Sequence, residues 1–318
     1  MKPLFIGGCE RSGTTMLGAM LGGHSRCLCL PESQFMDDQL AHADADGRID
    51  ARAALSRIVA HERFRLLWDL PSDPAPVQPA ELGPTLADLW TGLALAYGRK
   101  LGQPAAEVWI DHTPTNFRRV RGLLRLFPAA RFIHLVRDGR AVAASLLPLD
   151  WGPNNALHAA EFWMARCALG LAAELDLGPD RVLRVRYEDI LQEPESSLRR
   201  ITSFIGLDYE PEMASANASK PTRYHERQHH LVGQAPVPSR AAGWQQVLSR
   251  REVEMFEAEA GDFLETLGYQ PRYGVRAMPA TRVEVFRLRL GDLARRARNN
   301  LWRRWRVRRS IPQRRPEP

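Results

Sequence analysis

Cysteine is scarce in this sequence, and the few cysteines do not form a metal or disulfide framework. Only four occur in 318 residues, and none has the paired CxxC spacing of a zinc site. Four is also a small number for a secreted domain that disulfides hold together. We therefore expect free thiols, a reducing, cytoplasmic compartment and no bound metal.

Long apolar runs are missing as well. No stretch approaches the roughly 18 apolar residues that a membrane-spanning helix needs. The apolar part of residues 1–8 is too short for a signal peptide, and it predicts instead a first strand that runs directly into a glycine turn. We expect at most a peripheral contact with a lipid surface.

The net charge of +7 could indicate a nucleic-acid partner, but no zinc finger or aromatic RNA-binding motif accompanies it. The arginines instead crowd into residues 282–315. Apolar residues recur there at three-four spacing and predict a basic amphipathic helix: Val283, Phe286, Leu290, Leu293, Ala297 and Leu301. Such a helix suits an anionic membrane surface, although a helix packed on the domain or a solvated extension fits the same pattern.

Apolar strands alternate with helical segments along most of the chain. We expect strands at 3–8, 107–110, 131–136 and 181–185, and helices at 12–21, 51–68, 86–97, 151–175 and 194–205. This alternation predicts an α/β fold, a P-loop-type, mostly parallel sheet flanked by helices, with helical insertions between residues 35 and 104. We expect one large domain over residues 1–272 and the basic amphipathic extension over 273–318.

The strongest chemical signal is the segment GGCERSGTT at residues 7–15. Its glycines permit close backbone approach, and N–H groups at a helix start can hold an anion. The spacing nearly fits a nucleotide-kinase loop, but Thr14 stands where that motif has lysine, and a cation appears earlier as Arg11. A sulfuryl donor, which is less highly charged than a triphosphate, is compatible with arginine and hydroxyl groups and needs no metal.

A second motif, VRDGRAVAAS at 136–145, completes a resemblance to the sulfotransferases that use 3′-phosphoadenosine 5′-phosphosulfate. The chain most resembles the tyrosylprotein and bacterial branch. The resemblance implies that the first loop binds the phosphosulfate through Arg11, Ser12, Gly13, Thr14 and Thr15. It further implies that Arg137 and Ser145 bind the 3′-phosphate, which agrees with the ability of a strand-end arginine and a helix hydroxyl to converge on one anion.

Further site residues follow from the same resemblance. Glu32 occupies the place of the family's catalytic base, and His112 stands where relatives carry a lysine beside the transferring group. Either residue could take the acceptor's proton, and a protonated His112 could instead stabilise the bridging oxygen together with Arg11. Tyr187 matches a position near the nucleotide, and a closing loop is expected to contribute Ser239 and Arg240.

The expected reaction is in-line transfer of a sulfonate to a hydroxyl of a carbohydrate, a lipid, a small molecule or a peptide tyrosine. Two alternatives are a nucleotide-dependent P-loop kinase and a noncatalytic module that binds nucleotides or membranes. The histidines 225, 229 and 230 are expected to lie in a polar cleft loop that the substrate orders, and not to bind zinc, because no cysteine lies near them.

Overall fold

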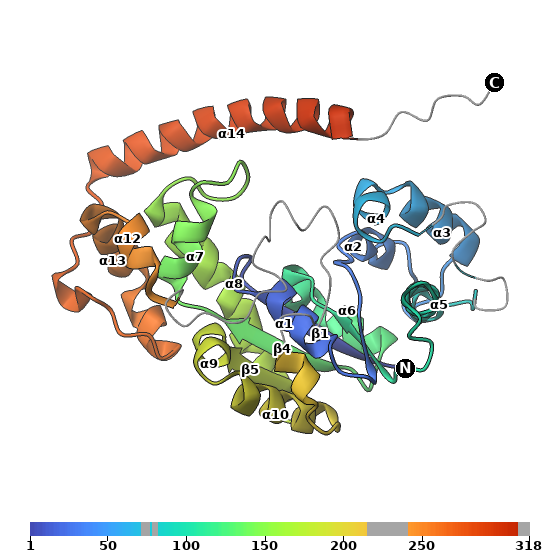
Figure 1. Ribbon diagram of the computed structural model, residues 1–318. Helices are drawn as coiled ribbons and strands as arrows, with labels where there is room; N and C mark the ends of the chain where they lie inside the picture. Colours follow the sequence, from blue (N-terminus) through green and yellow to red (C-terminus); the bar gives the residue numbers. More distant parts are fainter. Residues whose placement is uncertain (71–76, 78–81, 215–240, 311–318) are drawn as a thin grey trace. The chain divides into compact units, whose positions relative to one another are not determined.

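The computed structural model describes residues 1–70, 77, 82–214 and 241–310, and within the last helix it describes the side chains of 282–295, 297 and 298. The chain divides into two compact units, residues 1–137 with 166–238 and residues 138–165 with 239–318. The first unit contains a five-stranded sheet of order β2-β3-β1-β4-β5 (Figure 1). Its strands are β1 (Lys2–Gly8), β2 (Cys27–Cys29), β3 (Val108–Asp111), β4 (Arg131–Val136) and β5 (Val182–Arg186).

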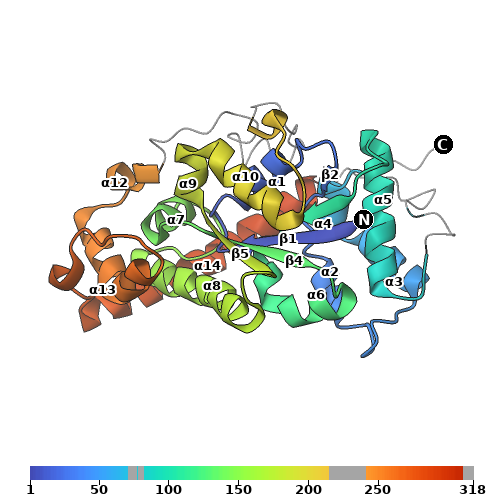
Figure 2. The ribbon, with the colours of Figure 1, turned by 90° about the horizontal axis from the view of Figure 1, so that it is seen from below.

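All four strand pairings in this sheet are parallel, which confirms the predicted fold class. Parallel strands need crossover connections, and helices supply them on both faces of the sheet. One face packs against α1 (Thr14–Leu21) and α10 (Pro194–Ile205), whose apolar residues join Leu4, Ile6 and Ile133 in one core cluster (Figure 2).

The opposite face of the sheet packs against the helical insertion. Phe5, Trp109 and Phe132 join an aromatic-rich cluster with side chains of this insertion and of the crossover helices. The helices of this layer are α2 (Met36–Leu40), α3 (Ala51–Ala60), α4 (Glu62–Leu67), α5 (Leu86–Leu101), the 3₁₀ turn η2 (Pro114–Arg119) and α6 (Val120–Leu126), together with residues 166–177 of α8 (Ala156–Leu177).

One predicted helix, 51–68, is wrong as a single element. His61 has extended backbone angles and ends α3, and its ring accepts a hydrogen bond from the backbone N–H of Arg63 at the start of α4. The side chain of His61 thus caps a new helix where the apolar periodicity predicted continuation. The strand β2 and the short α9 (Tyr187–Gln192) were not predicted, since each is too short to show a period.

The second unit is helical. It contains α7 (Gly139–Leu146), residues 156–165 of α8, α12 (Trp244–Val247), α13 (Arg250–Thr266), the turn η5 (Gly274–Arg276) and α14 (Arg282–Ser310). Asp138 caps α7 and pairs with Arg140 at 2.8 Å, and the same guanidinium pairs with the fully buried carboxylate of Glu257 at 2.6 Å. None of the described helices is both long and apolar enough to cross a bilayer.

We expect Gly8→Ala to destabilise the sheet strongly. Gly8 has φ 152°, and a Cβ placed there would lie 2.2 Å from the carbonyl oxygen of Leu135 on β4. Backbone atoms cannot yield at that distance, so urea denaturation followed by circular dichroism should show a loss of at least about 3 kcal/mol. Gly102→Ala is the matched control, because its φ is 72° with no heavy atom within 4 Å. It should lose about 1 kcal/mol, and equal losses would contradict the close strand contact.

Candidate active site

The loop between β1 and α1 requires glycine at its last position. Gly13 has φ 98°, and a Cβ there would lie 2.6 Å from the ring of Tyr187. Arg11 adopts φ 70°, a left-handed conformation that costs a non-glycine residue about 1–3 kcal/mol and that clusters at functional sites. The loop is thus held in a strained conformation directly before the helix start.

Three hydroxyl side chains of this loop are buried. Ser12, Thr14 and Thr15 have exposed fractions of 0%, 4% and 8%. Within the part of the chain that the structure describes, the Ser12 hydroxyl has no hydrogen-bond partner. A buried donor of this kind is costly unless a ligand satisfies it, and the first backbone N–H groups of α1 lie beside it. The loop therefore fits an anionic group such as a phosphate or sulfonate.

Two arginines add positive charge to the loop. Arg137 follows β4, and its Nη1 donates a hydrogen bond to the carbonyl oxygen of Arg11 at 2.8 Å. The guanidinium of Arg137 also lies 4.4 Å from the ring centre of Tyr187, within cation–π range. Burial and the neighbouring charge of Arg137 lower the pKa of Arg11. Two cations held this close favour an anion between or beside them.

Glu32 lies in the connection from β2 to α2 and is 12% exposed in its side chain. Burial raises its pKa to about 7, an effect that the Arg63 guanidinium 3.7 Å away only partly offsets. The indole N–H of Trp68 donates to the Glu32 carbonyl at 3.3 Å and holds the backbone. A carboxyl group with this pKa can accept and return a proton near neutral pH.

The segment after β3 is joined to the Glu32 connection by hydrogen bonds. The backbone N–H of Ser33 donates to the Thr113 hydroxyl at 2.9 Å, and the Ser33 hydroxyl donates to the buried carboxylate of Asp111. Asp111 also accepts from the Thr113 backbone at 2.8 Å and from the Asn116 amide at 2.9 Å. This network positions the residues on either side of it, Glu32 and His112.

His112 is buried, with 3% exposure, and packs against α1. A Cβ on Gly18 would lie 2.9 Å from its ring, so the glycine in α1 leaves the space that the imidazole needs. Burial lowers the pKa of His112 and outweighs the opposing charge of Asp111. The imidazole is therefore favoured in its neutral form, in which one ring nitrogen donates and the other accepts.

The structure thus brings most of the predicted residues together in the first unit. The loop residues 11–15 and Arg137 meet Tyr187, while Glu32 and His112 flank the network of Asp111. Ser145 lies on α7 in the second unit and is half-buried, so its convergence with Arg137 stays a prediction. Ser239, Arg240 and the histidines at 225, 229 and 230 lie outside the described residues. Among the residues that are described, no cluster of three or more His, Cys, Asp or Glu could hold a metal ion.

Sequence reasoning missed the residues that position the site. Asp111, Ser33 and Asn116 carry the network, and the run DHTPTN at 111–116, directly after a strand, is the signal that could have indicated it. Arg63 has no such signal, because it reaches Glu32 from a helix about 30 residues further along the chain. Glu10 pairs with Arg166 at 3.0 Å, again across a separation that no local pattern reveals.

Residues 3–211 match the model of the sulfotransferase family, and the chain belongs to that family. It is 29% identical over 214 residues to protein-tyrosine sulfotransferase 2 of Gallus gallus, covering 66% of this chain and 52% of the relative. It is 24% identical over 247 residues to the omega-hydroxy-beta-dihydromenaquinone-9 sulfotransferase of Mycobacterium bovis, covering 65% of this chain and 64% of the relative. The chain spans about half the length of the protein-tyrosine sulfotransferases that it matches.

Solved structures agree on the fold. The sulfotransferase domain of the Synechococcus PCC 7002 olefin synthase aligns with a TM-score of 0.59 at 22% identity, covering 85% of this chain and 94% of that domain. The sulfotransferase domain from the curacin biosynthetic pathway aligns with a TM-score of 0.55 at 20% identity, covering 85% and 98%. At these identities the likeness establishes the fold alone.

Proposed function

We propose that the protein transfers a sulfonate from 3′-phosphoadenosine 5′-phosphosulfate to an acceptor hydroxyl without a metal. The observation that carries this proposal is a cationic, hydroxyl-lined anion loop whose Arg11 interacts electrostatically with Glu32, a carboxyl group whose pKa burial raises to about 7. Such a carboxyl group is suited to remove the proton of an attacking hydroxyl, and the loop is suited to hold the donor.

In the proposed step, Glu32 accepts the hydroxyl proton as the acceptor oxygen forms a bond to sulfur. The bond between sulfur and the bridging phosphate oxygen breaks, and adenosine 3′,5′-bisphosphate leaves. Arg11 and the loop hydroxyls stabilise the charge that develops on this side, and a neutral His112 can donate its N–H to the bridging oxygen. We assign the role of the base to Glu32. Burial raises the pKa of Glu32 to about 7, whereas burial lowers the pKa of His112 and so disfavours its charged form.

Arg137 and Ser145 are proposed to bind the 3′-phosphate, and Ser239 with Arg240 to close over the nucleotide. We also propose that residues 1–272 form one sulfotransferase domain and that residues 273–318 form a basic amphipathic C-terminal extension. The acceptor is proposed to bear a hydroxyl, as carbohydrates, lipids, small molecules and tyrosine do. The chain's four cysteines are free thiols, which supports a reducing, cytoplasmic location.

The proposal is tested by incubating the protein with radiolabelled sulfonate donor and a panel of these hydroxyl classes, with EDTA present. We expect labelled product and stoichiometric adenosine 3′,5′-bisphosphate from at least one class. A parallel incubation with ATP and Mg²⁺ tests the kinase alternative, which the threonine at position 14 disfavours. Phosphorylated product from ATP alone would overturn the proposal.

We further propose that α14 contacts an anionic membrane surface. Asp292 is buried and accepts from Asn154 at 2.6 Å, and Arg295 donates to the carbonyl of Leu147 at 2.7 Å, so this side of the helix is anchored. The opposite side carries exposed apolar side chains, with Phe286 at 69% and Leu290 at 58% exposure. An apolar outer face on an arginine-rich helix is typical of interfacial binding.

We expect Phe286→Ser/Leu290→Ser to lower sedimentation with phosphatidylserine vesicles about tenfold, because two inserted side chains are lost. The wild-type protein should sediment poorly with phosphatidylcholine vesicles and should detach at high salt. Val275→Ser is the control, since Val275 is also apolar and fully exposed but lies in the turn η5. Equal binding to both vesicle types would contradict this proposal.

A further inference from the structure

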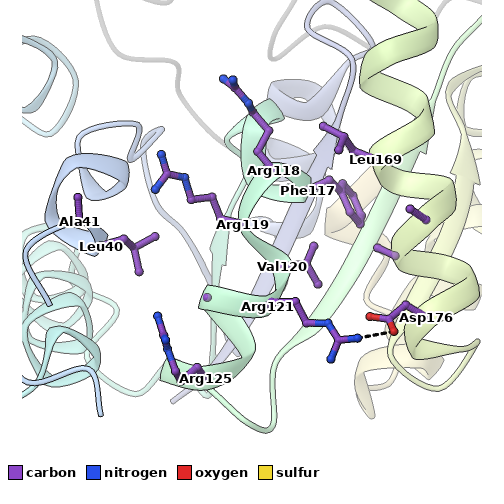
Figure 3. Close-up of a pocket in the computed structure, with 13 residues that line it drawn as sticks. Leu40, Ala41, Phe117, Arg118, Arg119, Val120, Arg121, Arg125, Leu169 and Asp176 are labelled. Carbon is purple, nitrogen blue, oxygen red and sulfur yellow. Dashed lines mark hydrogen bonds and ion pairs between the residues drawn. The ribbon is translucent and has the colours of Figure 1, made fainter. Parts of the chain in front are cut away.

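A pocket of about 570 Å³ lies on the face of the sheet that α6 and α8 cover, and no donor-loop residue lines it (Figure 3). Its walls come from α2, η2, α6 and α8, all within the first unit. Figure 3 shows Arg118 and Arg125 at opposite ends of the pocket, with Phe117 and Val120 between them. The pocket is therefore elongated, with cationic ends and an apolar middle.

The charge of this pocket is strongly positive. Four arginines line it against a single acidic side chain, that of Asp176, which pairs with Arg121 at 2.5 Å. Arg119 is held by Asp37, whose carboxylate lies 3.4 Å from its guanidinium. Within the described part of the chain, Arg118 and Arg125 are exposed and take part in no ion pair. Two guanidinium groups thus stay available to a ligand.

The pocket also offers apolar surface. Phe117, Val120 and Ala173 are at least 90% buried and form its floor, while Leu40 and Leu169 stand at its edges. Leu169 is 36% exposed, so its apolar surface is accessible at the edge of the pocket. Apolar surface beside unpaired guanidinium groups fits an amphiphile with an anionic end better than it fits an inorganic ion.

Both walls are continuous with the proposed acid–base residues. The helix α2 begins at Met36, shortly after Glu32, and η2 begins at Pro114, shortly after His112. Arg119 joins the two walls, because its Nη1 also donates to the backbone carbonyl of Asp37 at 3.1 Å. A molecule held between α2 and η2 therefore lies against the two elements that follow Glu32 and His112 in the chain.

We propose that this pocket binds the anionic end of an amphiphilic acceptor, such as a carboxylate on an aliphatic chain. The arginine at one end of the pocket, Arg118 or Arg125, binds the charged group, and the floor of Phe117 and Val120 contacts the chain. The assignment of the ligand as the acceptor rests on the proposed sulfotransferase function. The binding site itself depends only on the charge and shape of the pocket.

The test compares two probes that carry the same hydroxyl, 12-hydroxydodecanoate and 1,12-dodecanediol, by calorimetry with the full chain. We expect the carboxylate to bind at least about tenfold more tightly than the diol, because charge-assisted hydrogen bonds to arginine are strong. In Arg118→Gln/Arg125→Gln this preference should disappear. Arg200→Gln should keep it, since Arg200 is exposed on α10, which packs on the opposite face of the sheet.

Binding of adenosine 3′,5′-bisphosphate, measured in the same preparations, separates the two hypotheses. The double variant should bind this nucleotide as the wild type does, which also verifies that it is folded. Absence of carboxylate binding, or a carboxylate preference that survives the double substitution, would overturn the pocket assignment. Absence of nucleotide binding by a wild type that still prefers the carboxylate would overturn the proposed function and leave the anion site in place.

Discussion

Glu32→Gln is expected to lower kcat by about 10²–10⁴, the usual contribution of a general base. Glutamine keeps the shape of the side chain but cannot take the proton of the acceptor hydroxyl. Binding of adenosine 3′,5′-bisphosphate should change little, because the donor loop is untouched. Glu62→Gln is a matched control, since Glu62 begins α4, where it lies outside the network around Asp111.

The pH dependence of this reaction should carry the signature of Glu32. Its pKa is raised to about 7, so kcat/KM of the wild type should rise through that region as the carboxylate forms, and the variant should lack this step. Stability should move in the opposite direction. A carboxyl group whose pKa is higher in the folded state lowers the free energy of unfolding of the protein as pH rises from about 4.5 to 7. The loss is up to about 3 kcal/mol.

Glu32→Gln should therefore be more stable than the wild type at pH 8, and this advantage should vanish near pH 4.5. Thermal unfolding at the two pH values measures it. A variant that loses activity and also loses stability at pH 8 would indicate a structural role for Glu32. Full activity in the variant would exclude the carboxylate as the base and leave the role to His112.

Arg11→Ala is expected to lower kcat/KM by about 10²–10³, as the removal of one preorganised charge from a developing anion does. Alanine meets the same left-handed strain at φ 70°, so the backbone cost is nearly unchanged and the loss reports the guanidinium. Arg11→Lys tests whether charge alone suffices, and we expect partial recovery because lysine lacks the planar fork.

Single-turnover measurements with saturating donor determine where the loss occurs. If Arg11 acts mainly on the transition state, the rate of the chemical step falls while donor affinity changes by less than about tenfold. A loss confined to donor affinity would restrict Arg11 to binding. Unchanged kinetics would contradict its place in the site.

The fold was predictable because buried parallel strands leave continuous apolar runs. The predicted 131–136 strand and 194–205 helix have the bounds of β4 and α10, the latter marked by Pro194 at its start and Gly206 after its end. The predicted 151–175 helix begins later, at Ala156. Short elements such as β2 left no periodic pattern, and only tertiary packing determines them.

The donor loop was predictable for a related reason. Its glycines, hydroxyls and arginine are consecutive, so local spacing carries the chemistry. Glu32 could be proposed from its position, but its raised pKa could not, because the burial that causes it exists only in the folded chain. The pocket lined by α2, η2, α6 and α8 was not predicted, because its lining residues come from three separated segments of the chain.

Calorimetric titration of adenosine 3′,5′-bisphosphate into wild type and Arg137→Ala, in EDTA, tests the central claim most directly. Arg137 lies beside the Arg11 carbonyl and the Tyr187 ring, so its guanidinium is held in place for an anion. The account predicts metal-independent binding of the bisphosphate by the wild type, no comparable binding of ATP, and at least about tenfold weaker bisphosphate binding by the variant. Preference for ATP with Mg²⁺, or bisphosphate binding that the substitution leaves unchanged, would contradict it.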